Sequence, residues 1–436
     1  MKSTVQKILA VLVVVLLVAE IIHASKLNQK DSVTLAEKRP LLIWYTDPDI
    51  QEYMQQSAEA AAQYGVQVEM ELVSEVDYIE NISERSVAET MTGPDLYVLN
   101  SSQMEKAALA GLTDQLDDKQ MADTYSEKAV HAVTYDGKVM AYPFYVETSV
   151  LLYNRYYADE APATIDAILD YSENYEASEV TAKVENMFEW NVADVIENYM
   201  FLGGYTDLGG EDGDDKSQVS MDLDKAVECM MYYQSLNSFF ALDADTITSD
   251  EIIQDFIDGK TVFAIANASM IGKLDEAIAN GEIPEYPTER TVTDENGEEQ
   301  TEELNFDPFY AAAPLPDLTN DLETGGLSVT NAIAVNPYSV NRDAAAAIAR
   351  YLTEKNVGSL YEMTSKIPAC QSLAEAPTPA WDAVCEAYDK AAEVPKIMEL
   401  SDMWLHLEAT MADIWRGEDA ATQMQAFSDL MTERLN

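Results

Sequence analysis

The chain has 436 residues, of which 79 are acidic and 26 basic, so its formal net charge is −53. A field of this sign repels nucleic acids and anionic lipid surfaces, and we expect neither as a partner. Hydrophobic residues make up 47% of the chain, which excludes a disordered acidic tail and is enough to build two domains of ordinary size.

The N-terminus has the pattern of an export signal. Lys2 and Lys7 precede an apolar run at residues 8–19, which is shorter than the roughly 20 residues of a spanning helix and fits a signal-peptide core. We predict a signal peptide or an N-terminal anchor over residues 1–24 and a polar spacer over residues 25–40. Either alternative places the protein outside the cytoplasm, as a secreted, periplasmic or membrane-anchored protein that touches the membrane only through this segment.

The chain then opens with a β-α-β pattern. Residues 41–45 (LLIWY) predict a buried strand, a helix follows from about Asp49 to a stop at Gly65, and residues 66–72 alternate as in a second strand. A strand, helix and strand in this order form the unit of a parallel sheet with crossover helices.

Similar units recur further along. A helix from about Ser249 precedes a strand at residues 261–266, and a strand at residues 327–335 precedes an alanine-rich helix at residues 343–352. From Pro379 onward the pattern is mostly helical. Between these units, residues 291–303 contain the turn Asn296-Gly297 and predict a surface hairpin.

We predict no metal site and no cofactor. The acidic loop at residues 209–215 lacks the alternating ligands and closing glutamate of an EF-hand, so a solvated turn is expected there. The three cysteines, Cys229, Cys370 and Cys385, are too few for a disulfide framework. A bond between Cys370 and Cys385 and plain buried thiols both remain open.

Polar residues follow the predicted strand at residues 96–99. Asn100 and Ser101 come directly after it, and in open α/β sheets the ligand crevice lies beyond the carboxyl ends of the strands. These side chains are therefore placed to meet a ligand. The alternative is that they only cap the next helix.

Residues 135–155 carry a more specific pattern. An Asp-Gly turn leads to Tyr142-Pro143, then to the single carboxylate of Glu147, and then to an apolar strand that ends in Tyr153-Asn154. This segment resembles the hinge-crossing segment of the family 1 extracellular solute-binding proteins of ABC transporters, the maltodextrin-binding-protein-like group.

Further short motifs are similar to this family in the same order. They cover the chain from about Leu41 to its C-terminus, apart from the hairpin, and their order is more specific than any one of them. They are Ile43-Trp44, Gly93-Pro94-Asp95, residues 258–261 with 267–269, residues 314–316, Gly325-Gly326, Asn336-Pro337, and residues 394–397 followed by Ser401 and Trp404.

The resemblance implies an α/β fold of two lobes, the type II periplasmic-binding-protein fold, with a ligand cleft between the lobes. It also implies capture of a small polar solute by lobe closure, and docking on ABC transporter permease subunits. The expected lobe 1 comprises residues 41–145 and 327–372, and the expected lobe 2 comprises residues 148–326 and 373–436.

The family's sugar site carries over only in part. Glu147 occupies the position of a sugar-binding carboxylate, and Trp404 that of a stacking tryptophan. Leu99 and Ser269 replace other tryptophans, and Ser102-Gln103 replace an Asp-Arg pair. A linear maltodextrin site is therefore not reproduced. We expect a shorter or different sugar, and a non-sugar solute stays open.

A sugar site needs aromatic faces for C–H groups and planar polar groups for hydroxyls. For Trp190 a place in the core is the alternative, and Trp381 and Trp415 are expected in the core. The candidate ligand-binding residues are Trp44, Asn100, Ser101, Tyr145, Glu147, Trp190, Asn267, Ser269, Gly326 and Trp404.

A binding protein is favoured over an enzyme. The motifs of serine hydrolases, zinc proteases and P-loop enzymes are absent from the sequence. Carboxylate pairs of the glycosidase kind arise by chance among 79 acidic residues. The alternatives are a secreted glycoside hydrolase and a ligand-sensing protein that docks on a receptor without a role in transport.

Overall fold

The structure is a computed structural model that describes residues 39–62, 66–88, 92–116, 121–178, 180–293 and 299–435. The predicted signal peptide or anchor, nearly all of the spacer, the stop at Gly65 and the hairpin turn Asn296-Gly297 lie outside these residues. In the described ranges, no helix has the length and apolar character that crossing a membrane requires.

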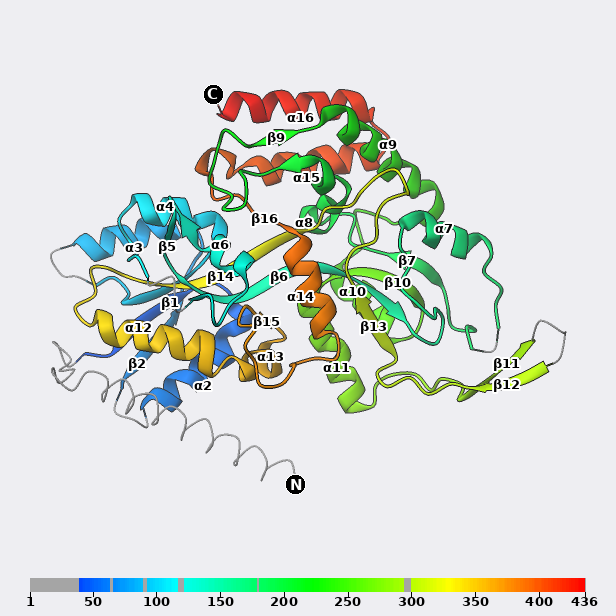
Figure 1. Cartoon of the computed structure of the whole chain (residues 1–436), viewed down its shortest axis with the longest axis horizontal. Helices are drawn as coiled ribbons and strands as arrows, with labels where there is room; N and C mark the ends of the chain where they lie inside the picture. The colour runs from blue at the N-terminus through cyan, green and yellow to red at the C-terminus, as the bar shows by residue number, and fades with distance from the viewer. Residues whose placement is uncertain are drawn as a thin grey trace, which may run out of the picture.

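The first α/β unit, on the left in Figure 1, is built on three parallel strands. The β-α-β pattern predicted from residue 41 onward is confirmed. β1 and β3 are apolar and largely buried, whereas the edge strand β2 alternates and is half-exposed. Its elements are β1 (Leu41–Tyr45), α2 (Gln51–Ala62), β2 (Val68–Leu72), α3 (Tyr78–Val87), β3 (Leu96–Asn100), α4 (Met104–Leu109), α6 (Glu127–Ala132), α12 (Arg342–Arg350) and α13 (Gly358–Thr364).

Two long strands connect this unit to the second one. β6 (Tyr142–Asn154) and β14 (Leu327–Val335) are antiparallel neighbours, and the main sheet has the strand order β2-β1-β3-β14-β6-β10-β7. Figure 1 shows β6 and β14 running from one unit into the other. We refer to them as the crossing strands. Two short strands flank them, namely β15 (Ile367–Pro368) and β16 (Ala392–Glu393).

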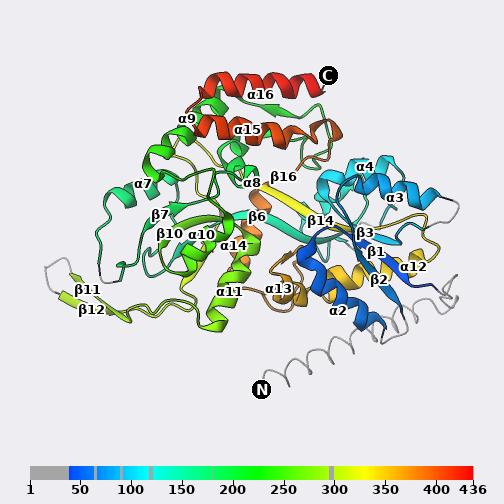
Figure 2. The same cartoon turned by 180° about the vertical axis from the view of Figure 1, so that it is seen from behind.

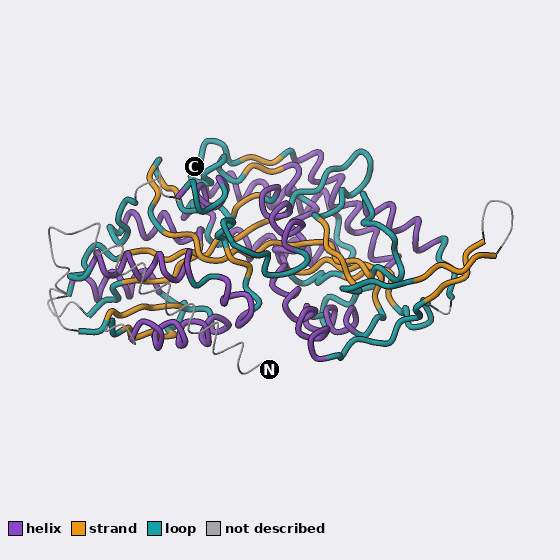
Figure 3. Tube along the Cα trace, turned by 60° about the horizontal axis from the view of Figure 1, so that its bottom comes forward, coloured by secondary structure: helices purple, strands orange, loops and turns teal. Residues whose placement is uncertain are grey.

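The second unit continues the sheet and adds a helical layer. The C-terminal helices pack on α9, at the top of Figure 1, and the predicted hairpin projects from the unit in Figures 1 and 3. Its elements are α7 (Ile165–Glu173), β7 (Asn186–Glu189), α8 (Val195–Asn198), α9 (Leu223–Phe240), α10 (Ser249–Ile257), β10 (Thr261–Asn267), α11 (Ile271–Asn280), β11 (Glu289–Thr293), β12 (Glu299–Glu303), β13 (Tyr310–Ala313), α14 (Trp381–Lys390), α15 (Met403–Trp415) and α16 (Ala420–Leu435).

This is the two-lobed α/β architecture that the resemblance implies. We propose the same division into lobes as the sequence predicts, with 41–145 and 327–372 in lobe 1 and 148–326 and 373–436 in lobe 2. Its support is that β6 passes through residues 145–148 without a break and that β14 starts at residue 327.

The three cysteines are free thiols in the structure, which answers the open question of a bond between Cys370 and Cys385. Burial raises the pKa of the Cys229 and Cys385 thiols to about 12. Because the thiolate is the reactive form, these side chains act as small core residues.

Candidate functional site

The crossing strands have two distinct faces. Successive strand residues point to opposite sides, and Val146 lines a small cavity together with Cys385 and Tyr388 of α14. Tyr145 and Glu147 therefore point away from α14. We call the side of the strands that faces away from α14 the crossing face. In Figure 1, α14 lies in front of β6, and Figure 2 shows the molecule from behind.

Strand register brings polar residues together on the crossing face. Asn331 lies opposite both Tyr145 and Asn100, and Asn267 lies opposite Ser149. Directly opposed residues of antiparallel strands share a face. The structure thus brings together four residues that the sequence predicted for the site, and it adds Ser149 and Asn331. The crossing face comprises Asn100, Tyr145, Glu147, Ser149, Asn267 and Asn331.

A buried ammonium group lies beside this face. Nζ of Lys366 is 3.1 Å from a Glu147 oxygen, 3.1 Å from an Asp47 oxygen and 3.4 Å from an Asp49 oxygen. The Tyr145 hydroxyl donates to Asp47 over 2.8 Å, and its ring centroid is 5.5 Å from the same Nζ. We call these five residues the lysine cluster.

The cluster sets the charge state of its lysine. Burial by itself lowers the pKa of Lys366, but the negative charges of Glu147 and Asp47 outweigh it and raise the pKa above the ordinary lysine value. Lys366 has 8% of its side chain exposed, against 29% for Glu147 and 21% for Asp47. The carboxylates therefore keep a side that a solute can reach.

Sequence reasoning missed Asp47 and Lys366. Asp47 follows the end of β1, so the rule that selected Asn100 at the carboxyl end of β3 would have found it. Lys366 has no local signal. It reaches the site because β15 pairs with β6, more than 200 residues away in the chain.

Two predicted residues lie on the α14 side instead. The Ser101 hydroxyl donates to the Glu393 carboxylate over 2.5 Å, and the Gly326 carbonyl accepts from the Ala392 amide over 2.8 Å. Ser101 is fully buried at the start of a 3-10 helix, whereas Asn100 is partly exposed at the end of β3. We therefore leave Ser101 and Gly326 out of the proposed site.

Two predicted tryptophans pack inside the lobes. Trp44 is 3% exposed, its indole N–H donates to Glu71 over 2.8 Å, and Arg85 covers its ring. Trp190 is 0% exposed, and its N–H donates to Asn198 over 3.0 Å. With no free face and no free donor, neither indole offers a surface to a solute in this structure.

The other two candidates lie in the second unit. Trp404 is half-buried on α15, with its ring 5.8 Å from that of Tyr199. Ser269 follows β10, where its hydroxyl and amide both bond to the Asn267 side chain. A role of Trp404 and Ser269 in ligand binding remains a prediction, because the contacts described above all lie within the second unit.

The acidic loop at 209–215 is more than a solvated turn. Asp212 pairs with the His131 ring over 2.5 Å, and Asp214 accepts from the Asp136 amide over 3.0 Å. The loop therefore contacts the first unit. Within the described parts of the chain, no group of three or more His, Cys, Asp or Glu residues is arranged to hold a metal ion.

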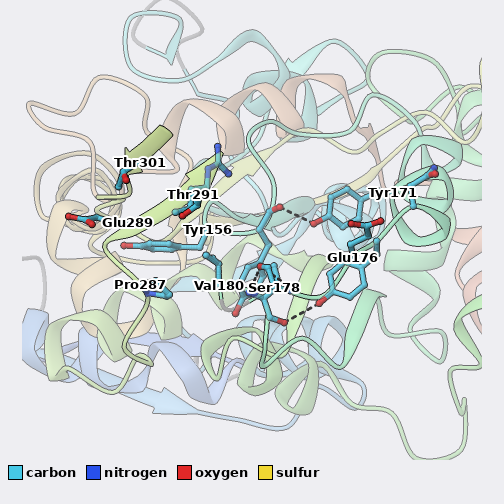
Figure 4. Close-up of a pocket in the computed structure, with 14 residues that line it drawn as sticks. Tyr156, Tyr171, Glu176, Ser178, Val180, Pro287, Glu289, Thr291 and Thr301 are labelled. Atoms are coloured by element: carbon cyan, nitrogen blue, oxygen red, sulfur yellow. Dashed lines mark hydrogen bonds between the residues drawn. The ribbon is translucent and has the colours of Figure 1, made fainter. Parts of the chain in front are cut away.

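A hollow of about 760 Å³ lies in the second unit, between the loop after α7 and the β11–β12 hairpin (Figure 4). Tyrosines line it, and two of their hydroxyl groups donate hydrogen bonds within the protein. Tyr171 donates to the Tyr157 carbonyl and Tyr175 to the Thr181 carbonyl. We prefer the crossing face as the candidate site, because strand pairing brings polar residues of both units together there.

The sequence comparisons identify the family of this chain. A family model described as bacterial extracellular solute-binding protein matches residues 55–389. A maltodextrin-binding protein of Bacillus subtilis (strain 168) is 24% identical over 315 residues, which is 70% of this chain and 68% of that protein. A galactooligosaccharide-binding protein of the same organism is 24% identical over 340 residues, which is 75% and 73% of the two chains.

Solved structures show the same fold. A cyclo/maltodextrin-binding protein complexed with maltotetraose matches with a TM-score of 0.69 at 19% identity, covering 92% of this chain and 99% of that chain. An extracellular solute-binding protein of Staphylococcus aureus in complex with maltose also matches with a TM-score of 0.69 at 19% identity, covering 91% and 98%. The two-lobed fold is confirmed, and because the family model matches most of its length, the chain belongs to the bacterial extracellular solute-binding proteins.

Proposed function

We propose that the protein captures a neutral sugar or short oligosaccharide on the crossing face, by closure of its two lobes, and delivers it to an ABC importer. The relatives named for maltodextrin and galactooligosaccharide binding support a sugar as the solute. The replaced tryptophans at Leu99 and Ser269 favour a shorter or different sugar over a long linear maltodextrin.

The observation that carries the proposal is the accessible carboxylate of Glu147 among amide and hydroxyl groups. A carboxylate accepts hydrogen bonds only, and an asparagine side chain both donates and accepts. Glu147 with Asn100, Asn267 and Asn331 thus forms a surface that matches the paired donors and acceptors of sugar hydroxyls. Four paired strands of the main sheet, β3, β14, β6 and β10, hold these groups, which reduces the entropy lost on binding.

Captured solute would be passed to a transporter. We propose permease subunits of an ABC transporter as partners, and a location outside the cytoplasm, with the N-terminal segment as signal peptide or anchor. The members of the family are binding proteins, and we propose no catalytic step for this chain.

A thermal-shift screen tests the proposal. Maltose, maltotriose, galactobiose and raffinose are added to the wild type, and binding to the native state raises its melting temperature. We expect at least one sugar to do so, and Glu147→Gln to weaken that effect while the exposed Glu386→Gln does not. Stabilisation by amino acids or peptides, with every sugar inactive, contradicts the proposal.

Lobe closure has its own readout. The radius of gyration from small-angle X-ray scattering should decrease when a saturating sugar is added, because the two units approach each other. An unchanged radius with the sugar bound would reject closure.

A further inference from the structure

We infer that Lys366 is a positioning and specificity-determining residue, which fixes the carboxylates of Glu147 and Asp47 toward the solute and makes the site reject anionic sugars. The inference rests on the proposed function, because it assigns a solute class to the same site. It adds a residue for which the sequence gives no signal.

The backbone holds Lys366 in place from two sides. The Lys366 amide donates to the Thr364 hydroxyl over 3.1 Å, and the next residue, Ile367, pairs with Val146 of β6. Ser365 packs so closely on α11 that a Cβ at Gly272 would lie 2.0 Å from the Ser365 hydroxyl oxygen. The base of the lysine side chain is therefore fixed between β6 and α11.

The side chain is fixed at its tip as well. The ammonium group contacts Glu147, Asp47 and Asp49, and it lies over the Tyr145 ring. The contact with Glu147 is a hydrogen bond, and those with Asp47 and Asp49 are ion pairs. Three carboxylates thus surround the ammonium group, so a carboxylate on an incoming solute has to displace one of them.

The resulting charge explains the expected selectivity. Three carboxylates against one ammonium group leave the cluster formally negative, so an anionic sugar meets repulsion without a free cation to bind. A neutral sugar instead donates hydroxyl protons to lone pairs that no protein donor uses. These belong chiefly to Glu147, because Asp47 also accepts from the Tyr145 hydroxyl and the Asp49 amide. Glu147 and Asp47 are partly exposed, so these lone pairs are accessible, which distinguishes the cluster from an ion pair enclosed in the core.

The first experiment needs no solute. Unfolding of the wild type, Lys366→Met, Glu147→Gln and the double variant forms a double-mutant cycle. We expect Lys366→Met to lower the folding equilibrium constant at least tenfold, and Glu147→Gln to recover part of that loss. Lys390→Met, which removes an exposed pair with Glu386, is the matched control. Additive effects would overturn the pairing of Lys366 with Glu147.

The second experiment measures selectivity by isothermal titration calorimetry with maltotriose, galactobiose and trigalacturonate. The wild type should bind a neutral probe and not trigalacturonate. Lys366→Met should weaken the neutral probe at least tenfold. Asp47→Asn/Glu147→Gln, which leaves only Asp49 paired with Lys366, should tighten trigalacturonate at least tenfold. Trigalacturonate binding by the wild type that is lost in Lys366→Met, or unchanged selectivity in both variants, overturns the inference.

Failure of the proposed function has a different signature. It appears as the absence of any sugar binding in the wild type, while the unfolding cycle still measures the coupling of Lys366 to Glu147. If Lys366 and Glu147 are energetically coupled but no sugar binds, the lysine cluster is a structural ion pair, and its role in specificity is overturned.

Discussion

Trp404 and Trp415 lie on the same helix in different surroundings. Trp415 is 3% exposed and its N–H donates to the Leu242 carbonyl, whereas Trp404 is half-buried against Tyr199. Trp415→Ala should cost about 3–5 kcal/mol of unfolding free energy. Trp404→Ala should cost less than about 2 kcal/mol and weaken sugar binding by about 1–3 kcal/mol, the scale of base–aromatic stacking.

Chemical denaturation and calorimetry separate the two variants. A Trp404→Ala protein that loses as much stability as Trp415→Ala, with its sugar affinity intact, would show that Trp404 is a packing residue and not part of the site.

Glu197 predicts a pH dependence of stability. Its side chain is buried, and burial together with the negative charge of Asp194 raises its pKa to about 8. Between pH 4.5 and 8 the folded state holds a proton that the unfolded state releases, so the unfolding free energy falls as pH rises through this window. Glu197→Gln removes this loss and should stabilise the protein by about 3 kcal/mol at pH 7.

The measurement is the melting temperature of both proteins from pH 4 to pH 8. The difference should be small at pH 4 and grow with pH, while exposed Glu84→Gln stays parallel to the wild type. A Glu197→Gln protein that is less stable at pH 7 would show that the carboxylate is ionised in the fold.

At the residue scale, the sequence predicted which positions lie near the site better than it predicted the face to which each side chain points. Asn100, Tyr145, Glu147 and Asn267 share the crossing face, since position at a strand end or on a crossing segment placed them there. Trp44 and Trp190 lie at equally plausible positions but point into the lobes. A tryptophan beside a strand end carries no signal for which face it takes, because that depends on strand register and on the helix above.

At the scale of elements, one carboxylate on the α14 side of the crossing strands bonds to several neighbouring segments. Glu393 of β16 accepts from Ser101 over 2.5 Å, from Ser328 over 2.9 Å and from the Thr330 amide over 2.8 Å. It thereby links the turn after β3 with β14 and β16. Ser101, which the sequence suggested for ligand binding, serves this junction instead.

Removing that carboxylate should loosen the junction. Glu393→Ala removes the acceptor of the buried Ser101 hydroxyl and leaves the Thr330 amide only a 3.4 Å contact with that hydroxyl, and it should cost about 2–4 kcal/mol. Glu386→Ala, on the exposed side of α14, should cost less than about 0.5 kcal/mol. Urea denaturation of the two variants gives the comparison, and equal midpoints would mean that water replaces Glu393 without loss.

Two glycines should respond to alanine in opposite ways. A Cβ at Gly203 would lie 1.8 Å from the Gly325 carbonyl oxygen, whereas a Cβ at Gly358 of α13 meets nothing within 4 Å. Gly203→Ala should cost about 3 kcal/mol or more, and Gly358→Ala should add about 0.5–1 kcal/mol. Thermal unfolding measures both; a stable Gly203→Ala protein would contradict the close backbone contact.

Elements with strong periodicity were predicted well. The strands at residues 41–45 and 327–335 have the observed bounds, and the helix expected at 343–352 is α12 at 342–350, continued by a π-helical turn. The acidic loop at 209–215 was predicted less well. Its contacts with His131 and Asp136 join segments about 80 residues apart, and such pairings leave no local pattern.

At the scale of the whole molecule, the two-lobed fold follows from the order of weak motifs. Each motif predicts a turn or a strand, and the motifs together predict the crossing segments that connect the two lobes. The solute-binding family and the fold were predicted in this way and confirmed. The lysine cluster was not, because Asp47, Glu147 and Lys366 come from segments that only the folded crossing strands bring together.

A crystal structure of the protein with a bound oligosaccharide is the most direct measurement of the central claim. We predict that the sugar lies on the crossing face, with a hydroxyl oxygen about 2.6–3.2 Å from the Glu147 carboxylate and the lysine cluster intact. A sugar bound in the tyrosine-lined hollow of the second unit, with nothing on the crossing face, would contradict the account.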